Sequence, residues 1–184
     1  SGVTENRQYY ANVFAWIKEH TEKDAVIFSD DQLMRFIPAY THANVYNTQY
    51  AYNMPASDVG VIERYLLSHF FEPDFFESED LGINEDGRIL WAFPHESEKN
   101  THSIAGRWAI PYEPQYGIEK EREKVREVYD ALLREGWGVS LLKKYRIDYI
   151  VWDRKEKPEW NIERNDKLEL VEQIGDVLIY RLKA

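Results

Sequence analysis

A short apolar run at residues 24–29, DAVIFS, constrains the fold more than any other part of this sequence. The run does not alternate between apolar and polar residues, which is typical of a strand buried on both faces, as in a parallel sheet. The preceding segment has a different period, because its apolar residues recur at helical spacing: Tyr10, Val13, Phe14 and Ile17. The chain is therefore predicted to open with a helix followed by a buried strand.

The alternation of helix-like and strand-like segments continues to the end of the chain. Further strands are predicted at 44–47 and 148–152, and helices begin near Ser57 and Glu119. The β-rich runs 168–173 and 177–182 flank a glycine turn, which predicts a hairpin. These elements predict an α/β fold: a mixed, partly parallel sheet flanked by helices, with a C-terminal β-hairpin.

The middle of the chain lacks this regularity. Residues 71–118 contain four of the seven prolines, and only one strand is predicted there, at 88–93. We interpret 71–118 as an irregular insertion in a single α/β domain of residues 3–184. Ser1 and Gly2 are interpreted as the remnant of a cleaved tag.

The composition argues against several classes of partner and site. The chain has 33 acidic and 23 basic side chains and a formal net charge of −10, so we expect no basic face for nucleic acid or anionic lipid. It has no cysteine, which excludes disulfides, thiolate metal sites and cysteine nucleophiles, and which fits an extracytoplasmic protein. No apolar run approaches the ~20 residues of a membrane span, and no signal peptide is evident.

Two neighbouring carboxylates, Asp30 and Asp31, follow the first predicted strand. Ligands of open α/β sheets bind outside the carboxyl ends of the strands, which makes this position a candidate site. In the functional interpretation, one aspartate acts as a base or binds a metal or a sugar hydroxyl, and His42 lies nearby.

A structural interpretation of the same residues is favoured. Ser29 or Asp30 would cap a short helix that runs from Asp31 to about Phe36, because these residue types are common at helix N-termini. Pro38 is expected to limit the continuation of that helix, since it lacks an N–H group.

The sequence offers no strong motif for a metal or a cofactor. The five histidines do not form the helical zinc signature, and the glycines form neither a dinucleotide-binding nor a nucleophile-elbow motif. A metal site in the insertion would use His95, His102, Glu96 and Glu98, but this interpretation is not favoured. We predict no cofactor, no metal and no catalytic residue in this chain.

Both ends of the chain resemble a known family. The segments that carry the resemblance are FAWIKEHT at 14–21, DAVIFS at 24–29, IPAYT at 37–41, VY at 45–46, LKKYRIDYIV at 142–151 and VLIYR at 177–181. In this order they resemble the C-terminal soluble domain of bacterial polytopic membrane proteins related to GT-C glycosyltransferases, which use lipid-linked sugars.

The resemblance implies an extracytoplasmic domain tethered by membrane spans outside this sequence. Its partners would be its own upstream transmembrane region and a glycan or lipid-linked sugar. In that family the catalytic acidic residues lie upstream, so the implied role here is non-catalytic: assembly, or positioning of an acceptor glycan. A ligand-binding face is expected at the carboxyl ends of the strands, where carboxylates and aromatic rings suit a sugar: Asp30, Asp31, His42, Tyr46, Tyr50, Trp152 and Asp153.

Two other hypotheses remain. The chain could be a small stand-alone hydrolase or transferase that uses Asp30 or Asp31 with His42, which requires these side chains to lie within hydrogen-bond reach of one another. It could also be an interaction module that uses residues 71–118.

Overall fold

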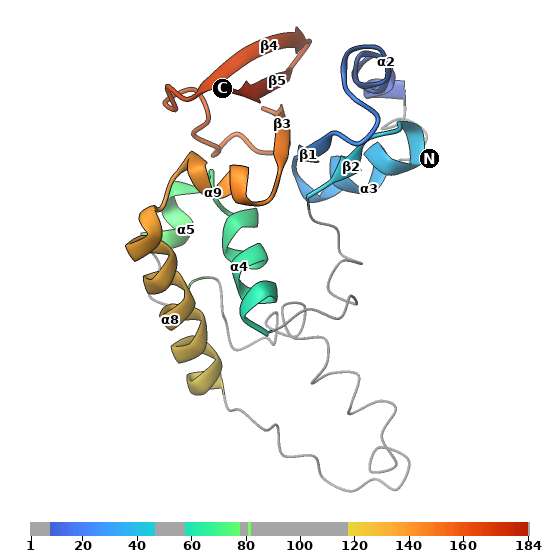
Figure 1. Ribbon diagram of the computed structural model, residues 1–184. Coiled ribbons are helices and arrows are strands. Elements are labelled where there is room, and N and C mark those ends of the chain that lie inside the picture. Colours follow the sequence, from blue (N-terminus) through green and yellow to red (C-terminus); the bar gives the residue numbers. More distant parts are fainter. Residues whose placement is uncertain (1–7, 47–57, 78–80, 82–117, 184) are drawn as a thin grey trace, which may run out of the picture. The chain divides into compact units, whose positions relative to one another are not determined.

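The structure, a computed structural model, describes residues 8–46, 58–77, 81 and 118–183 (Figure 1). Contacts within the chain divide it into two compact units. The first, which we call the sheet unit, combines Ser1–Thr48 with Gly138–Ala184, and the second, the helical unit, is Gln49–Trp137. The prediction of one domain over residues 3–184 stays a prediction.

The sheet unit contains a five-stranded mixed sheet. Its strands are β1 (Val26–Phe28), β2 (Asn44–Val45), β3 (Ile147–Asp153), β4 (Leu168–Ile174) and β5 (Val177–Leu182), in the order β2-β1-β3-β5-β4. The first three strands in this order are parallel, and β5 runs antiparallel to both of its neighbours. Gly175 makes the hairpin turn with φ +63°, a conformation that favours glycine. The α/β class, the parallel early strands and the terminal hairpin are confirmed.

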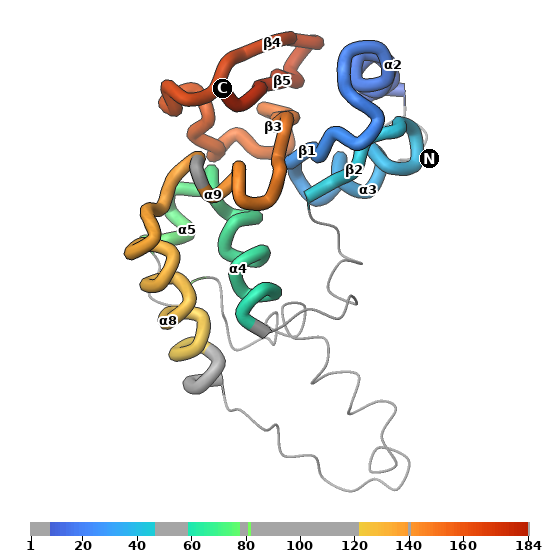
Figure 2. Tube along the Cα trace, viewed as in Figure 1, coloured from blue at the N-terminus to red at the C-terminus, as the bar shows by residue number. Residues whose placement is uncertain are grey.

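The N-terminal and C-terminal parts of the sheet unit meet at the centre of the sheet. Ile27 of β1 lies opposite Tyr149 of β3, and Phe28 lies opposite Ile150. Figure 2 shows the blue trace of β1 beside the orange trace of β3. Neither segment can complete its backbone hydrogen bonds without the other, so the two parts of the sheet unit fold as one body.

Helices α2 (Ala11–His20) and α3 (Asp31–Tyr40) pack against one face of the sheet. The predicted stripe on α2 is buried, with Val13 and Ile17 at 0 % exposure. These side chains share a core with Ile27 and Val151 of the sheet. Burial of each large aliphatic side chain contributes about 1.5–3 kcal/mol, so this layer stabilises much of the sheet unit.

The opposite face of the sheet carries aromatic side chains. The Phe28 ring lies 5.8 Å from the Tyr46 ring and 5.6 Å from the Trp160 ring, measured between centroids. Tyr46 also contacts Tyr145 edge-on at 5.3 Å, at the end of α9 (Val139–Lys144). Strand β1 is therefore covered on both faces, as its continuous apolar run predicted.

The predicted end of α3 near Phe36 is wrong. The helix continues to Tyr40 with Pro38 inside it. A proline at this position removes only the N–H that would bond to the Met34 carbonyl, while Thr41 donates both its N–H and its hydroxyl to the Ile37 carbonyl. Pro38 is exposed, so its ring meets solvent and the buried side of the helix is intact.

The helical unit contains α4 (Asp58–Ser68), α5 (Pro73–Glu77) and α8 (Ile118–Gly136). The apolar stripes predicted for α4 and α8 are buried at Ile62, Leu66, Val125 and Leu132. Gly136, with φ +98°, ends α8 as expected for a glycine after a helix.

Helix α5 corrects the prediction of irregular structure from residue 71 onward. Pro73 is its first residue, a position where the fixed φ of proline favours a helix and its missing N–H has no intrahelical partner. The rest of the predicted insertion from residue 82 to 117, with its strand at 88–93, lies outside the described residues, as does Ser57. None of the helices described here is both long and apolar enough to cross a membrane.

Candidate functional site

Asp30 and Asp153 lie at the same edge of the sheet. Asp153 is the last residue of β3, and Asp30 follows β1 by two residues. Because β1 and β3 are parallel, their carboxyl ends meet at one edge, which we call the carboxyl edge. Both side chains are buried, with exposed fractions of 4 % and 1 %.

Asp30 caps helix α3. One of its carboxylate oxygens, Oδ1, accepts hydrogen bonds from the backbone N–H groups of Gln32 and Leu33, each at 2.9 Å. The neighbouring Ser29 hydroxyl donates to the Val151 carbonyl of β3 at 2.6 Å. The structural interpretation of Asp30 as a helix cap is confirmed.

Asp153 uses both of its carboxylate oxygens in hydrogen bonds. The Tyr10 hydroxyl donates to Oδ2 at 2.8 Å, and the backbone N–H of Lys155 donates to Oδ1 at 2.9 Å. Tyr10 is 1 % exposed and directly precedes α2. The bond therefore fixes the start of α2 against the end of β3.

Burial dominates the electrostatics of this edge. It raises the pKa of Asp30 above its usual value, the two backbone donors oppose this, and the negative charge of Asp153 adds to it. Burial and the bond to Asp153 also raise the pKa of Tyr10, so the phenol stays protonated as a donor. The carboxylates bind backbone and phenol groups of the protein itself, and this geometry holds elements together.

The other residues predicted for this face take different positions. Asp31 is exposed in the first turn of α3. Trp152 is buried, and its indole N–H donates to the Lys157 carbonyl at 2.7 Å. Tyr46 is buried against Phe28, and Tyr50 lies outside the described residues.

His42 is not brought to the carboxyl edge. It precedes β2, and its Nε2 lies 3.0 Å from the carbonyl of Thr21. Asp30 and His42 flank the ten residues of α3, which separates them by about 15 Å along the helix. The arrangement required by the stand-alone hydrolase or transferase is therefore not formed by Asp30 and His42.

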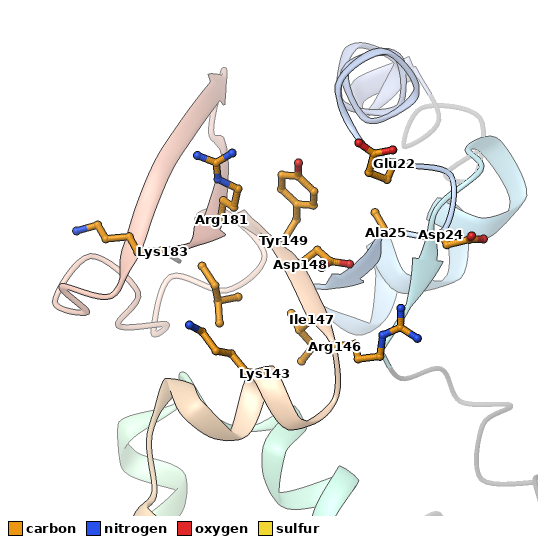
Figure 3. Close-up of a pocket in the computed structure, with 11 residues that line it drawn as sticks. Glu22, Asp24, Ala25, Lys143, Arg146, Ile147, Asp148, Tyr149, Arg181 and Lys183 are labelled. Atoms are coloured by element: carbon orange, nitrogen blue, oxygen red, sulfur yellow. The ribbon is translucent and has the colours of Figure 1, made fainter.

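Sequence reasoning missed two features of the sheet unit. The first is Tyr10, which is 143 residues from its partner Asp153 and was recognised only as part of an apolar stripe. The second is a polar hollow at the amino edge, where β1 and β3 begin, lined in part by Asp24, Lys143 and Asp148 (Figure 3). Three separate segments form this hollow, so no local sequence motif predicts it.

Within the ranges that the structure describes, no group of three or more His, Asp or Glu side chains could hold a metal ion. The loop residues considered as metal ligands, His95 and His102, lie outside those ranges. Comparisons of the chain with protein families, with curated proteins and with solved structures found no match.

The raised pKa of Asp30 predicts a pH-dependent effect of Asp30→Asn. Asparagine caps helices about as well as aspartate, so the two backbone bonds are retained while the buried charge is removed. Since the folded pKa lies above the ordinary value of 3.8, ionisation of Asp30 weakens the fold as the pH rises through the folded pKa. We expect the stability of the variant relative to the wild type to increase from pH 3.5 to neutral pH.

The measurement is urea unfolding at several pH values, followed by the NMR signal of the Trp152 indole N–H, which reports on the sheet unit. Asp31→Asn is the matched control, because Asp31 is exposed in the same helical turn. Parallel pH profiles of the wild type and Asp30→Asn would contradict the prediction.

Proposed function

We propose that this chain is a non-catalytic extracytoplasmic domain of a membrane-bound glycosyltransferase-like protein, and that it aids assembly or positions an acceptor glycan. One observation carries the proposal. The two segments that resemble this family, at 14–46 and 142–181, together form the sheet unit, although about half of the chain separates them.

The residues of these segments are largely those that build the core. Ile27, Val151 and Ile179 are each fully buried and belong to one apolar cluster. If this chain shares a domain with that family, the shared motifs should build one folded body. The reason is that core positions tolerate few substitutions of different volume. The burial of these residues therefore supports a resemblance between whole domains, beyond a resemblance between single motifs.

The geometry of the carboxyl edge supports a non-catalytic role. Asp30 is occupied by the backbone of α3, and Asp153 is occupied by Tyr10 and Lys155. A general acid or base must be within reach of a substrate proton, whereas these oxygens are buried and engaged within the protein.

Burial of the predicted rings favours assembly over glycan positioning. Trp152 and Tyr46 have exposed fractions of 5 % and 4 %, so their faces pack on protein and not on a sugar. The partner that this role implies is the upstream transmembrane region of the same protein.

The test is sugar transfer by membranes that contain the full-length protein and a lipid-linked donor. We expect Asp31→Asn and His42→Gln, the two accessible candidates, to keep activity within about twofold of the wild type. Removal of a general acid or base costs about 100-fold or more, so a loss of that size in either variant would contradict the non-catalytic role. Membranes without the donor supply the background.

A further inference from the structure

The hollow at the amino edge of the sheet has the size of a small-molecule site. Its volume is ≈ 540 Å³, within the range of about 300–1,000 Å³ typical of ligand pockets. It lies entirely within the sheet unit. The lining residues are Glu22, Asp24, Ala25, Lys143, Arg146, Ile147, Asp148, Tyr149, Arg181, Leu182 and Lys183.

The charged side chains of this hollow are partly separated by sign. Figure 3 shows Lys143 of α9 on the same side as Arg181 and Lys183 of the last strand and its end. Glu22 and Asp24, from the turn before β1, lie on the other side, where Arg146 also lies next to Asp24. Asp148 and Tyr149 of β3 lie between them.

Some of the charged groups already have partners in the protein. Asp148 Oδ2 accepts from the backbone N–H of Val26 at 2.8 Å, and Arg181 pairs with Glu169 at 3.0 Å. The ammonium of Lys183 donates to the Asp166 carbonyl. These interactions hold three of the lining side chains in place.

Four other charged side chains remain available to a ligand. In the part of the chain that the structure describes, Lys143, Arg146, Glu22 and Asp24 make no side-chain hydrogen bond or ion pair. All four are exposed. Two cations and two anions therefore line the hollow without an ion pair between them.

The backbone at Arg146 is strained. This residue follows the end of α9 with φ +55°, a left-handed conformation that usually favours glycine at this position. An arginine here costs stability that a glycine would not. Strained residues cluster at functional sites, and Arg146 lines the hollow.

We propose that this hollow binds a small zwitterionic ligand of the amino-acid or short-peptide class. The ligand's carboxylate contacts Lys143 and the cationic side, and its ammonium group contacts Glu22 and Asp24. Its apolar body packs on Ala25, Ile147 and Leu182. A ligand with one sign of charge is attracted by one side and repelled by the other, so the zwitterion is selected.

The test is an NMR titration of the isotope-labelled chain with three matched peptides. Alanyl-leucine carries both charges, its N-acetyl form lacks the ammonium group, and its amide lacks the carboxylate. We expect alanyl-leucine to shift the backbone amide signals of Ala25, Asp148 and Leu182 at millimolar concentration. Each of the other two peptides is expected to bind about tenfold more weakly.

Variants separate the hollow from general surface charge. Lys143→Gln and Glu22→Gln are each expected to weaken alanyl-leucine binding about fivefold. Lys18→Gln and Glu19→Gln make the same charge changes at exposed positions of α2 outside the hollow and should leave binding unchanged.

Three outcomes would overturn the proposal. Equal binding of the N-acetyl peptide would make the hollow a site for anions, and equal binding of the amide would make it a site for cations. The absence of shifts at Ala25, Asp148 and Leu182 with all three peptides would show that the hollow holds no ligand of this class.

Discussion

Ile27→Ala is expected to lower the free energy of unfolding of the sheet unit by about 2–5 kcal/mol. Ile27 is fully buried in β1, the strand that pairs with β2 on one side and β3 on the other. Its side chain packs in a cluster with Val13 of α2 and Leu33 of α3. Truncation would leave a cavity where the N-terminal and C-terminal parts of the sheet unit pack together.

Urea unfolding followed by the Trp152 indole signal measures this loss without a contribution from the tryptophans of the helical unit. Val26→Ala is the control, because Val26 is the preceding residue of the same strand and is only partly buried. If the two variants lose the same stability, Ile27 does not occupy the centre of the core.

Asp153→Ala is expected to destabilise the sheet unit by about 3 kcal/mol, since hydrogen bonds to charged groups contribute about 1.5–3 kcal/mol and a buried donor is left unsatisfied. The variant removes the acceptor for the Tyr10 hydroxyl and for the Lys155 backbone N–H. Tyr10 cannot find water as a substitute, because it is 1 % exposed.

A double-mutant cycle with Tyr10→Phe isolates the bond between the two side chains. The double variant should be more stable than the sum of the two single losses predicts. Asp176→Ala is the control: this aspartate lies beside the same part of the sheet and pairs with Lys155 at 2.6 Å, but the pair is exposed and should contribute little. Additive losses in the cycle would show that the Tyr10–Asp153 bond does not stabilise the fold.

Local patterns in the sequence predicted most of the sheet unit. The stripe on α2, the unbroken apolar run of β1 and the glycine turn between β4 and β5 are short-range signals, and each one specifies its element. The same holds for Asp30, because a side-chain cap is determined within three residues of the helix start.

The features that the sequence could not predict depend on contacts between distant residues. The Tyr10–Asp153 bond joins two segments 143 positions apart, and the charged hollow needs the turn before β1, the end of α9 and the end of β5. The error at Pro38 has another cause, because a local rule about proline was outweighed by the burial of Leu33, Met34 and Ile37 on the other side of α3.

The location of the domain is the central claim, and a cysteine-accessibility measurement tests it most directly. The chain has no cysteine, so Glu156→Cys introduces one reactive group at an exposed position, in a cysteine-free version of the full-length protein. Val151→Cys is the matched control, because that side chain is fully buried and should react only after denaturation.

The reagent is a maleimide that cannot cross membranes, applied to intact cells and then to permeabilised cells. The proposal predicts that Glu156→Cys is labelled in intact cells and that the labelled protein sediments with the membranes. Labelling only after permeabilisation, or recovery of the full-length protein in the soluble fraction, would contradict an extracytoplasmic, membrane-bound domain.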